Sequence, residues 1–205
     1  MTAFRSGLFF GLSLIISLGP QNLFLVRQGL TRQYVYLCAS VCFICDVILI
    51  LLSTQGLSYI IEHAAWLKVT LLIAGSAFLA LYGINSIRSA IKRRQTKQAN
   101  ITPIQEHIAL STLLLTCLSF SLLNPQAIID TVILIGSTVM QYPTQSHWGF
   151  ILGTLVASLV WFFSLATIAR SCSKYLTYKL WSNLELLSGT IMLFFAAKLA
   201  SMLTV

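Results

Sequence analysis

The chain has 205 residues, of which 57% are hydrophobic and only 9% are charged. Soluble domains carry roughly 25% charged residues, so this composition excludes a soluble globular protein and indicates one that is embedded in a membrane. A net charge of +8 would suggest nucleic-acid binding in a soluble protein. Here the cations lie between apolar stretches, where they report orientation in the bilayer instead.

Six apolar windows follow one another along the chain, each close to or above the roughly 20 residues that cross a hydrocarbon core. They are Leu8–Val26, Leu37–Ile61, Trp66–Ile87, Ile108–Gly136, Trp148–Ala169 and Leu180–Leu203. The first window resembles the apolar part of a signal peptide, but no small-residue cleavage site follows it, so we expect a retained span. We predict an all-α integral membrane protein with six transmembrane helices. Five spans remain open if the first window only dips into the membrane.

Gly19 and Pro20 interrupt the first window near its centre. Proline lacks a backbone N–H and clashes with the preceding helical turn. In lipid the freed backbone groups need partners, so such a break is tolerated only where protein or a polar cavity receives it. Gln21 and Asn22 then place two side-chain amides directly after the break. This stretch predicts a broken helix beside a binding site.

The same device recurs at Asn124 and Pro125 in the fourth window, 105 residues after Pro20. Two broken spans in corresponding halves are a sequence sign of a transporter's binding site. With three spans in each half, the second repeat would be inverted in the membrane relative to the first. The predicted parts are a first three-helix repeat over residues 1–87, a basic cytoplasmic linker over 88–106 and a second three-helix repeat over 107–205.

The loops that follow the odd-numbered windows are basic, whereas the fourth loop, Gln141–His147, carries no lysine or arginine. The basic residues of loops one, three and five are Arg27, Arg32, Arg88, Lys92, Arg93, Arg94, Lys97, Arg170, Lys174 and Lys179. The positive-inside rule places these three loops in the cytoplasm and both termini outside, with only Arg5 opposing this orientation.

Two aspartates, Asp46 and Asp130, lie inside apolar windows. A carboxylate within the membrane costs at least roughly 2.5–3.5 kcal/mol on insertion scales, so such a residue marks a functional site by default. The alternative is a structural ion pair with Arg27, Lys68 or Lys198, which lie near window ends where long side chains can reach water.

This set of groups suits a particular kind of ligand. The N-terminus of a half-helix presents unpaired N–H groups and a positive dipole end, which suit a carboxylate. Aspartates suit an ammonium or a guanidinium group, so the inventory fits a basic amino acid. We expect Asp46 and Asp130 to border one cavity, within about 10 Å of each other. The alternative is that Asp130 serves a separate proton path.

Two pairs of glycines have the GxxxG spacing that lets membrane helices approach closely. They are Gly7 with Gly11 and Gly149 with Gly153. We expect helix packing from both pairs and leave open a homodimer through one of them.

Several classes of protein lack their sequence signals here. The chain has no phosphate-binding G-x-x-x-x-G-K-[ST] loop and no H-E-x-x-H or G-x-S-x-G motif. Cys42 and Cys45 have CxxC spacing on an apolar window, where we expect them to pack as small apolar residues, because zinc would need more ligands nearby. We therefore predict no enzyme activity, no metal site, no disulfide framework and no cofactor.

Short motifs along the whole chain resemble those of the LysE/ArgO-type basic amino-acid exporters, in the same order. They are Ser17-Leu18-Gly19-Pro20-Gln21-Asn22, Val26-Arg27-Gln28-Gly29, Arg32-Gln33-Tyr34, Asp46, Trp66-Leu67, Tyr82-Gly83, Leu123-Asn124-Pro125, Asp130-Thr131, Gly153-Thr154 and Trp161-Phe162-Phe163. The Gly-Pro-Gln-Asn form is closer to the lysine/arginine branch of that family than to the homoserine/threonine branch.

The resemblance implies efflux of L-arginine or L-lysine across the bacterial inner membrane, driven by the proton motive force. It carries over as functional positions Gly19, Pro20, Gln21, Asn22, Asp46, Asn124, Pro125 and Asp130. The implied partners are an amino-acid substrate, protons and the lipid bilayer, with no nucleic acid. Two alternatives stay open at this point. One is export of another small cationic solute, and the other is a passive channel or a structural membrane subunit.

Overall fold

The computed structural model describes residues 2–16, 19–54, 65–96, 109–122, 128 and 130–203. Every element in these ranges is a helix, which confirms the all-α prediction for this part of the chain. The elements are α1 (Thr2–Ile15), α2 (Pro20–Thr31), α3 (Val35–Thr54), α5 (Ala65–Thr96), α6 (Leu110–Leu122), the π-helix η1 (Asp130–Ile135), α8 (Gly136–Val139), α9 (Thr144–Cys172), the 3-10 helix η2 (Ser173–Tyr175) and α10 (Tyr178–Ser201).

Four of the described helices, α3, α5, α9 and α10, are long and apolar enough to cross a membrane. The pair α1 and α2 would add a fifth span, with its two segments bent by 79°. The predicted fourth window is described as the shorter pieces α6, η1 and α8, and residues 123–127 between them lie outside the described ranges. The structure therefore supports a multi-pass architecture, while the count of six spans goes beyond it.

Large apolar side chains cover much of the outer surface of these helices. Leu81 on α5, Leu115 on α6 and Phe194 on α10 are each about two-thirds exposed, at 65%, 66% and 65%. Exposed apolar side chains on long apolar helices suit contact with lipid tails.

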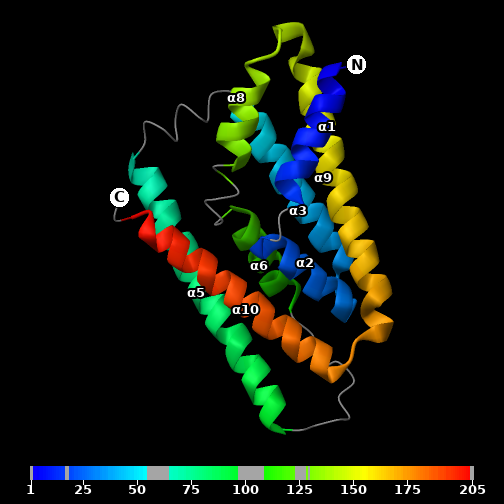
Figure 1. The fold of residues 1–205 in the computed structure, drawn as a ribbon, viewed down its shortest axis with the longest axis vertical. Coiled ribbons are helices and arrows are strands. Elements are labelled where there is room, and N and C mark those ends of the chain that lie inside the picture. The colour runs from blue at the N-terminus through cyan, green and yellow to red at the C-terminus, as the bar shows by residue number, and fades with distance from the viewer. Residues whose placement is uncertain are drawn as a thin grey trace.

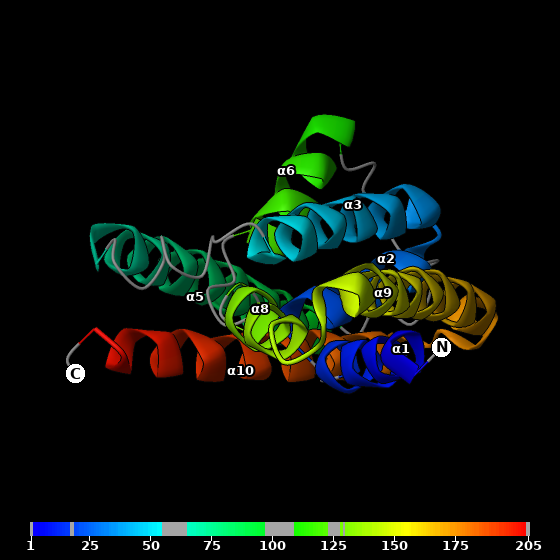
Figure 2. The ribbon, with the colours of Figure 1, turned by 90° about the horizontal axis from the view of Figure 1, so that it is seen from above.

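The helices form a layered bundle (Figures 1 and 2). Seen from above, α6, α3, α9 and α1 lie in that order across the molecule, and α5 and α10 lie together at one side. The packing agrees with this view, because α3 contacts both α6 and α9 while α1 packs against α9. The helix α2 contacts α3, α6, α9 and α10, so it is central to the bundle.

Glycines allow α1 and α9 to approach until their backbones touch. A Cβ atom on Gly7 would lie 2.1 Å from the Phe150 carbonyl oxygen, and one on Gly153 would lie 2.1 Å from that of Phe4. The Thr154 hydroxyl adds a hydrogen bond of 3.2 Å to the Gly7 carbonyl. The predicted packing role of the GxxxG pairs is thus realised within one chain. A homodimer stays a prediction and would need another surface.

The helix α5 continues further than the sequence analysis predicts. We expected the third span to end at Ile87 and a linker to begin at residue 88, but α5 extends to Thr96. Neither glycine nor proline interrupts this segment, and Arg94 bonds to the neighbouring α10 through the Ser182 hydroxyl at 3.1 Å. Tertiary contacts therefore hold the first part of the predicted linker in the helix.

Aromatic and small side chains fill the centre of the bundle. The Phe120 ring lies 4.9 Å from Phe78, 4.9 Å from Tyr82 and 5.0 Å from Phe24, measured between ring centroids. Cys38, Cys42, Cys45 and Cys117 are buried free thiols. This matches their expected role as small packing residues.

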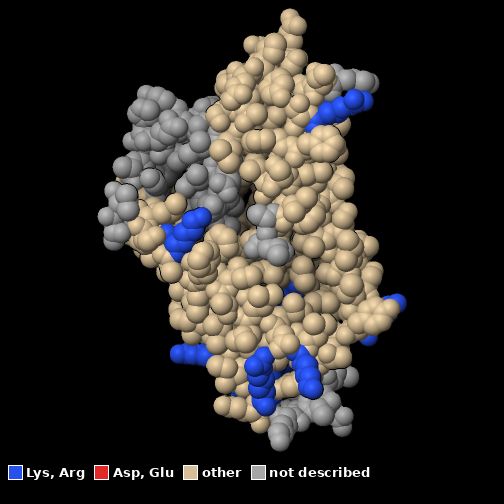
Figure 3. All heavy atoms as spheres, in the orientation of Figure 1, with Lys and Arg blue, Asp and Glu red and all other residues tan. Residues whose placement is uncertain are grey.

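Basic side chains gather toward one end of the molecule, the lower end in Figure 3. The end of α2, the end of α5 and the junction of α9 with α10 meet there (Figure 1). These are the places that carry the basic loops one, three and five of the sequence. We refer to this end as the basic end.

Candidate functional site

The break in the first span has a defined geometry on its α2 side. Gly19 is the N-cap residue of α2, with extended backbone angles (φ −80°, ψ 170°), and Pro20 occupies the first helical turn. Proline suits this place because the missing N–H would have no partner within the helix. Because Gly19 has no side chain, the N-cap residue makes no side-chain hydrogen bond to the first turn of α2. The first turn therefore carries the positive end of the helix dipole, which attracts an anion.

Asn22 connects the two halves of the broken helix through a hydrogen bond. Its amide nitrogen donates to the Ile15 carbonyl at the end of α1 (2.7 Å), and its amide oxygen accepts from the Trp161 indole on α9 (3.3 Å). The side chain is buried, with 6% of it exposed. A carbonyl freed by the break thus receives the partner that a buried backbone group needs.

Gln21 lies on the same first turn and is partly buried. Its amide nitrogen is buried and has no hydrogen-bond partner among the described residues. The Cys42 thiol of α3 lies beside this amide. An unsatisfied buried donor is costly, at about 1–3 kcal/mol, which makes Gln21 a ready donor to an incoming acceptor.

Asp46 lies in the second half of α3 and is partly buried. One of its carboxylate oxygens accepts a hydrogen bond of 2.7 Å from the hydroxyl of Ser158, a fully buried residue of α9. Among the residues described, both ion pairs involve a different carboxylate, that of Glu185. The described surroundings of Asp46 thus give it a hydroxyl and no cation.

A single face of α9 brings the start of α2 and the middle of α3 together. Ser158 and Trp161 are three residues apart on α9, so they lie on the same helix face. Ser158 binds Asp46 and Trp161 binds Asn22. On α3, Cys42 lies one turn before Asp46 and contacts Gln21. The predicted site residues Gln21, Asn22 and Asp46 are therefore neighbours in space, next to the N-terminus of α2.

The second half of the predicted site is only partly described. Asn124, Pro125 and the side chain of Asp130 lie outside the described part of the structure, so their contacts and the predicted break at Pro125 are not addressed by it. The backbone of Asp130 begins the π-helix η1, and η1 packs against α3. Helix α3 is the one that carries Asp46. A shared cavity for the two aspartates stays a prediction.

Glu185 is a buried carboxylate that the sequence analysis missed. It lies on α10 with 2% of its side chain exposed, between Arg27 of α2 and Arg93 of α5. The distances are 3.8 Å from Arg27 Nη2 to Oε1 and 3.2 Å from Arg93 Nε to Oε2. The only signal in the sequence is an acidic residue inside the last apolar window, and nothing in the spacing pairs it with either arginine.

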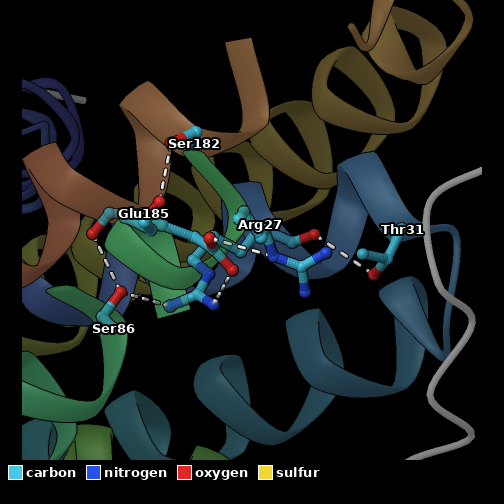
Figure 4. A network of polar contacts seen from close by, with 7 residues as sticks. Arg27, Thr31, Ser86, Ser182 and Glu185 are labelled. Carbon is cyan, nitrogen blue, oxygen red and sulfur yellow. Dashed lines mark hydrogen bonds and ion pairs between the residues drawn. The ribbon is translucent and has the colours of Figure 1, made fainter. Parts of the chain in front are cut away.

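The network around Glu185 joins three helices at the basic end (Figure 4). The Arg27 Nη1 donates to the Ser86 hydroxyl at 3.1 Å, and that hydroxyl donates to the Glu185 carbonyl at 2.9 Å. We considered Arg27 as a structural partner of Asp46, but it pairs with Glu185 instead.

Comparison with known proteins identifies the family. A model of the LysE type translocator family matches residues 12–203, nearly the whole chain. The chain belongs to this family. It is therefore a transporter rather than an enzyme, and a multi-pass membrane protein.

Individual relatives are similar over almost their full length. The chain is 32% identical to an arginine exporter protein ArgO of Klebsiella pneumoniae subsp. pneumoniae, over 97% of this chain and 93% of that protein. It is 33% identical to ArgO of Escherichia coli K12, over 95% and 91%. It is 34% identical to a putative amino-acid transporter, YggA, of Aeromonas salmonicida, over 95% and 94%. No solved structure matches the chain.

Proposed function

We propose that this chain is a secondary transporter that exports basic L-amino acids, arginine or lysine or both, across the bacterial inner membrane. The proton motive force drives the export. Relatives of the chain carry the name arginine exporter, and the family is one of translocators. The observation that carries the proposal is the Asp46 carboxylate next to the N-terminus of a broken helix, bonded to Ser158 and to no described cation.

The two sides of this site complement the two ends of a basic amino acid. The positive end of α2 and the Gln21 amide receive the substrate carboxylate. Asp46 receives a cationic group, either the α-ammonium or the side chain. A carboxylate that holds either the substrate cation or a proton makes the two compete for one site. That competition couples amino-acid export to proton movement in the opposite direction.

Helix packing supports the arrangement as two inverted repeats of three spans each. In such an arrangement α3 corresponds to α9 and α5 corresponds to α10. The two helices of each pair would then meet across the pseudo-two-fold axis that relates the repeats. Both pairs pack together. The contact of α1 with α9 in turn corresponds to that of α6 with α3, and both contacts are present. We propose that one half rocks against the other around the site during alternating access.

The orientation of the protein follows from its charges. The basic end would face the cytoplasm, and both termini would lie outside. A cysteine at the exposed position Gln95, in a background without the native cysteines, tests this. It should resist a membrane-impermeant thiol reagent in intact cells and react in inverted vesicles. Ready labelling in intact cells would contradict the orientation.

Uptake into inverted inner-membrane vesicles tests the function itself. Labelled arginine and lysine should accumulate when a proton gradient is imposed and stop accumulating when it is collapsed. Vesicles without the protein are the control. Uptake that is insensitive to the gradient would leave a passive channel as the better reading, and uptake of quaternary ammonium ions alone would favour export of another cationic solute.

A further inference from the structure

The Arg27 guanidinium group is enclosed by side chains from two other helices. It lies 5.7 Å from the centroid of the Tyr82 ring of α5 and 5.6 Å from that of the Trp181 ring of α10. Both distances are within the roughly 6 Å over which a cation is attracted to an aromatic face. The Ser86 hydroxyl and the Glu185 carboxylate complete the surroundings. We call Tyr82, Ser86, Trp181 and Glu185 the guanidinium box.

Arg27 is held loosely in this box. Its distance of 3.8 Å to the carboxylate exceeds hydrogen-bond length, so the contact is electrostatic only. Among the described residues, its guanidinium donates one hydrogen bond, the 3.1 Å bond to Ser86, although a guanidinium has five N–H donors. Arg93, in contrast, approaches Glu185 to 3.2 Å. The carboxylate therefore keeps a close cationic partner when Arg27 leaves.

The box lies nearer the basic end of the molecule than the start of α2 does. Arg27 and Gln21 are six residues apart on α2, which corresponds to about 9 Å along the helix axis. Gln21 lies at the start of α2, in the neighbourhood of Asp46, and Arg27 lies near the other end of α2, which is at the basic end (Figure 1). Under the proposed orientation, a substrate would reach the box from the cytoplasm before it reaches Asp46.

We propose that the guanidinium box is a second binding site, selective for guanidinium cations, which Arg27 fills in this conformation and which an arginine substrate takes over on its way to Asp46. The proposal rests on the proposed function for the identity of the natural ligand. The chemistry favours a guanidinium over an ammonium, because a planar delocalised cation stacks on aromatic faces and bonds to a carboxylate in a fixed fork.

Resident Arg27 competes with any external guanidinium. If it fills the box about nine-tenths of the time, the apparent affinity for a ligand is about tenfold lower than the intrinsic affinity. Removal of the Arg27 side chain should therefore strengthen binding. A purely structural role for Arg27 predicts binding to the variant alone, because the emptied space beside Glu185 admits a guanidinium only after the side chain is removed. A binding site that Arg27 fills part of the time predicts that the wild-type protein also binds the probe, about tenfold more weakly, and no detectable binding to the wild type would overturn the proposal.

The test measures binding of methylguanidinium to the purified full-length protein by calorimetry, with methylammonium as the matched probe. Methylguanidinium has no carboxylate and does not require the Asp46 site. Arg27→Ala should bind it about tenfold more tightly than the wild type. Methylammonium should show no such gain. The double variant Arg27→Ala/Glu185→Gln should lose the gain.

A second variant guards against failure to fold. Arg27→Met keeps the apolar stem of the side chain and removes the charge, and it should show the same gain. Equal binding of both probes, no gain in either variant, or failure of both variants to fold would overturn the proposal. Arginine counterflow separates this proposal from the proposed function. Transport without a gain in methylguanidinium binding refutes the box alone, and the gain without transport refutes the transport proposal alone.

Discussion

Two regions in the interior of this molecule each contain a carboxylate, and the two carboxylates have different partners. Asp46 accepts a hydrogen bond from Ser158, and no described cation pairs with it. Glu185 is almost completely buried and lies between two arginines from different helices. The first arrangement leaves a negative charge for a ligand to neutralise, whereas the second neutralises the charge within the protein. In this conformation Asp46 is therefore the carboxylate that is open to a ligand, whereas Glu185 pairs with the protein's own arginines and stabilises the bundle.

The substitution Asp46→Asn should have the largest effect on transport. It keeps the shape of the side chain and removes the charge, and bonds to charged groups contribute about 1.5–3 kcal/mol, so arginine uptake into inverted vesicles should fall about 10- to 100-fold. The unfolding midpoint in detergent should stay at or above the wild-type value. Wild-type uptake by a normally expressed Asp46→Asn protein would remove Asp46 from the site.

The substitution Glu185→Ala should act on stability instead. It leaves two arginines close together without their counterion. Breaking a fully buried pair costs about 3–5 kcal/mol, and the partial exposure of the arginines (16% and 22%) reduces the expected loss to about 2–3 kcal/mol. Unfolding in mixed micelles measures this loss. The double variant Glu185→Gln/Arg27→Met should regain part of it. Unchanged stability with abolished transport would reverse the roles of the two carboxylates.

A substitution in the packing interface between α1 and α9 can change the surroundings of Asp46 without a change at Glu185. A methyl group on Gly153 would meet the Phe4 carbonyl at 2.1 Å, so Gly153→Ala should force α1 away from α9, which carries Ser158. We expect a loss of about 1–3 kcal/mol in stability and reduced uptake.

The matched control is Gly149→Ala on the same helix. There a methyl group would meet the Ala3 Cβ at 3.7 Å, an ordinary contact. Stability should change by less than about 0.5 kcal/mol. Equal effects of the two substitutions would contradict the close packing of α1 on α9.

The smallest effect should come from Ser158→Ala, which removes the hydroxyl that orients Asp46. Asp46 keeps its charge and water can replace the lost hydroxyl, so the cost should lie below the full value of a bond to a charged group, at about 1 kcal/mol, and uptake should fall about fivefold. Ser40→Ala is the control, because that hydroxyl bonds to the Tyr36 carbonyl within α3, six residues before Asp46. A fivefold loss in both variants would show that the Asp46 bond has no special role.

Local chemistry explains which features could be predicted from the sequence. Gly19 and Pro20 act on their own backbone, so their pattern predicts a break wherever the chain folds, and the structure has its bend there. Asp46 is recognisable because it is a charge within a long apolar window. The hydrogen bonds of Asn22 to the Ile15 carbonyl and to the Trp161 indole depend on how the chain folds. The sequence indicates only that an amide is present.

Long-range contacts explain what the sequence could not supply. Glu185 meets Arg27 and Arg93 only because α2, α5 and α10 converge at the basic end. The extension of α5 to Thr96 likewise depends on bonds from Arg94 to α10. Neither contact has a spacing rule, because the partners are joined by the fold and not by helical periodicity.

Counterflow in proteoliposomes tests the central claim most directly. Purified protein is reconstituted into vesicles preloaded with unlabelled arginine, lysine or leucine, and labelled arginine is added outside. Our account predicts transient accumulation of label in vesicles that contain arginine, or another basic amino acid that the carrier accepts, and none in vesicles that contain leucine. It also predicts that Asp46→Asn reduces the accumulation about 10- to 100-fold. Equal entry of label whatever the vesicles contain would contradict the account and indicate a passive channel.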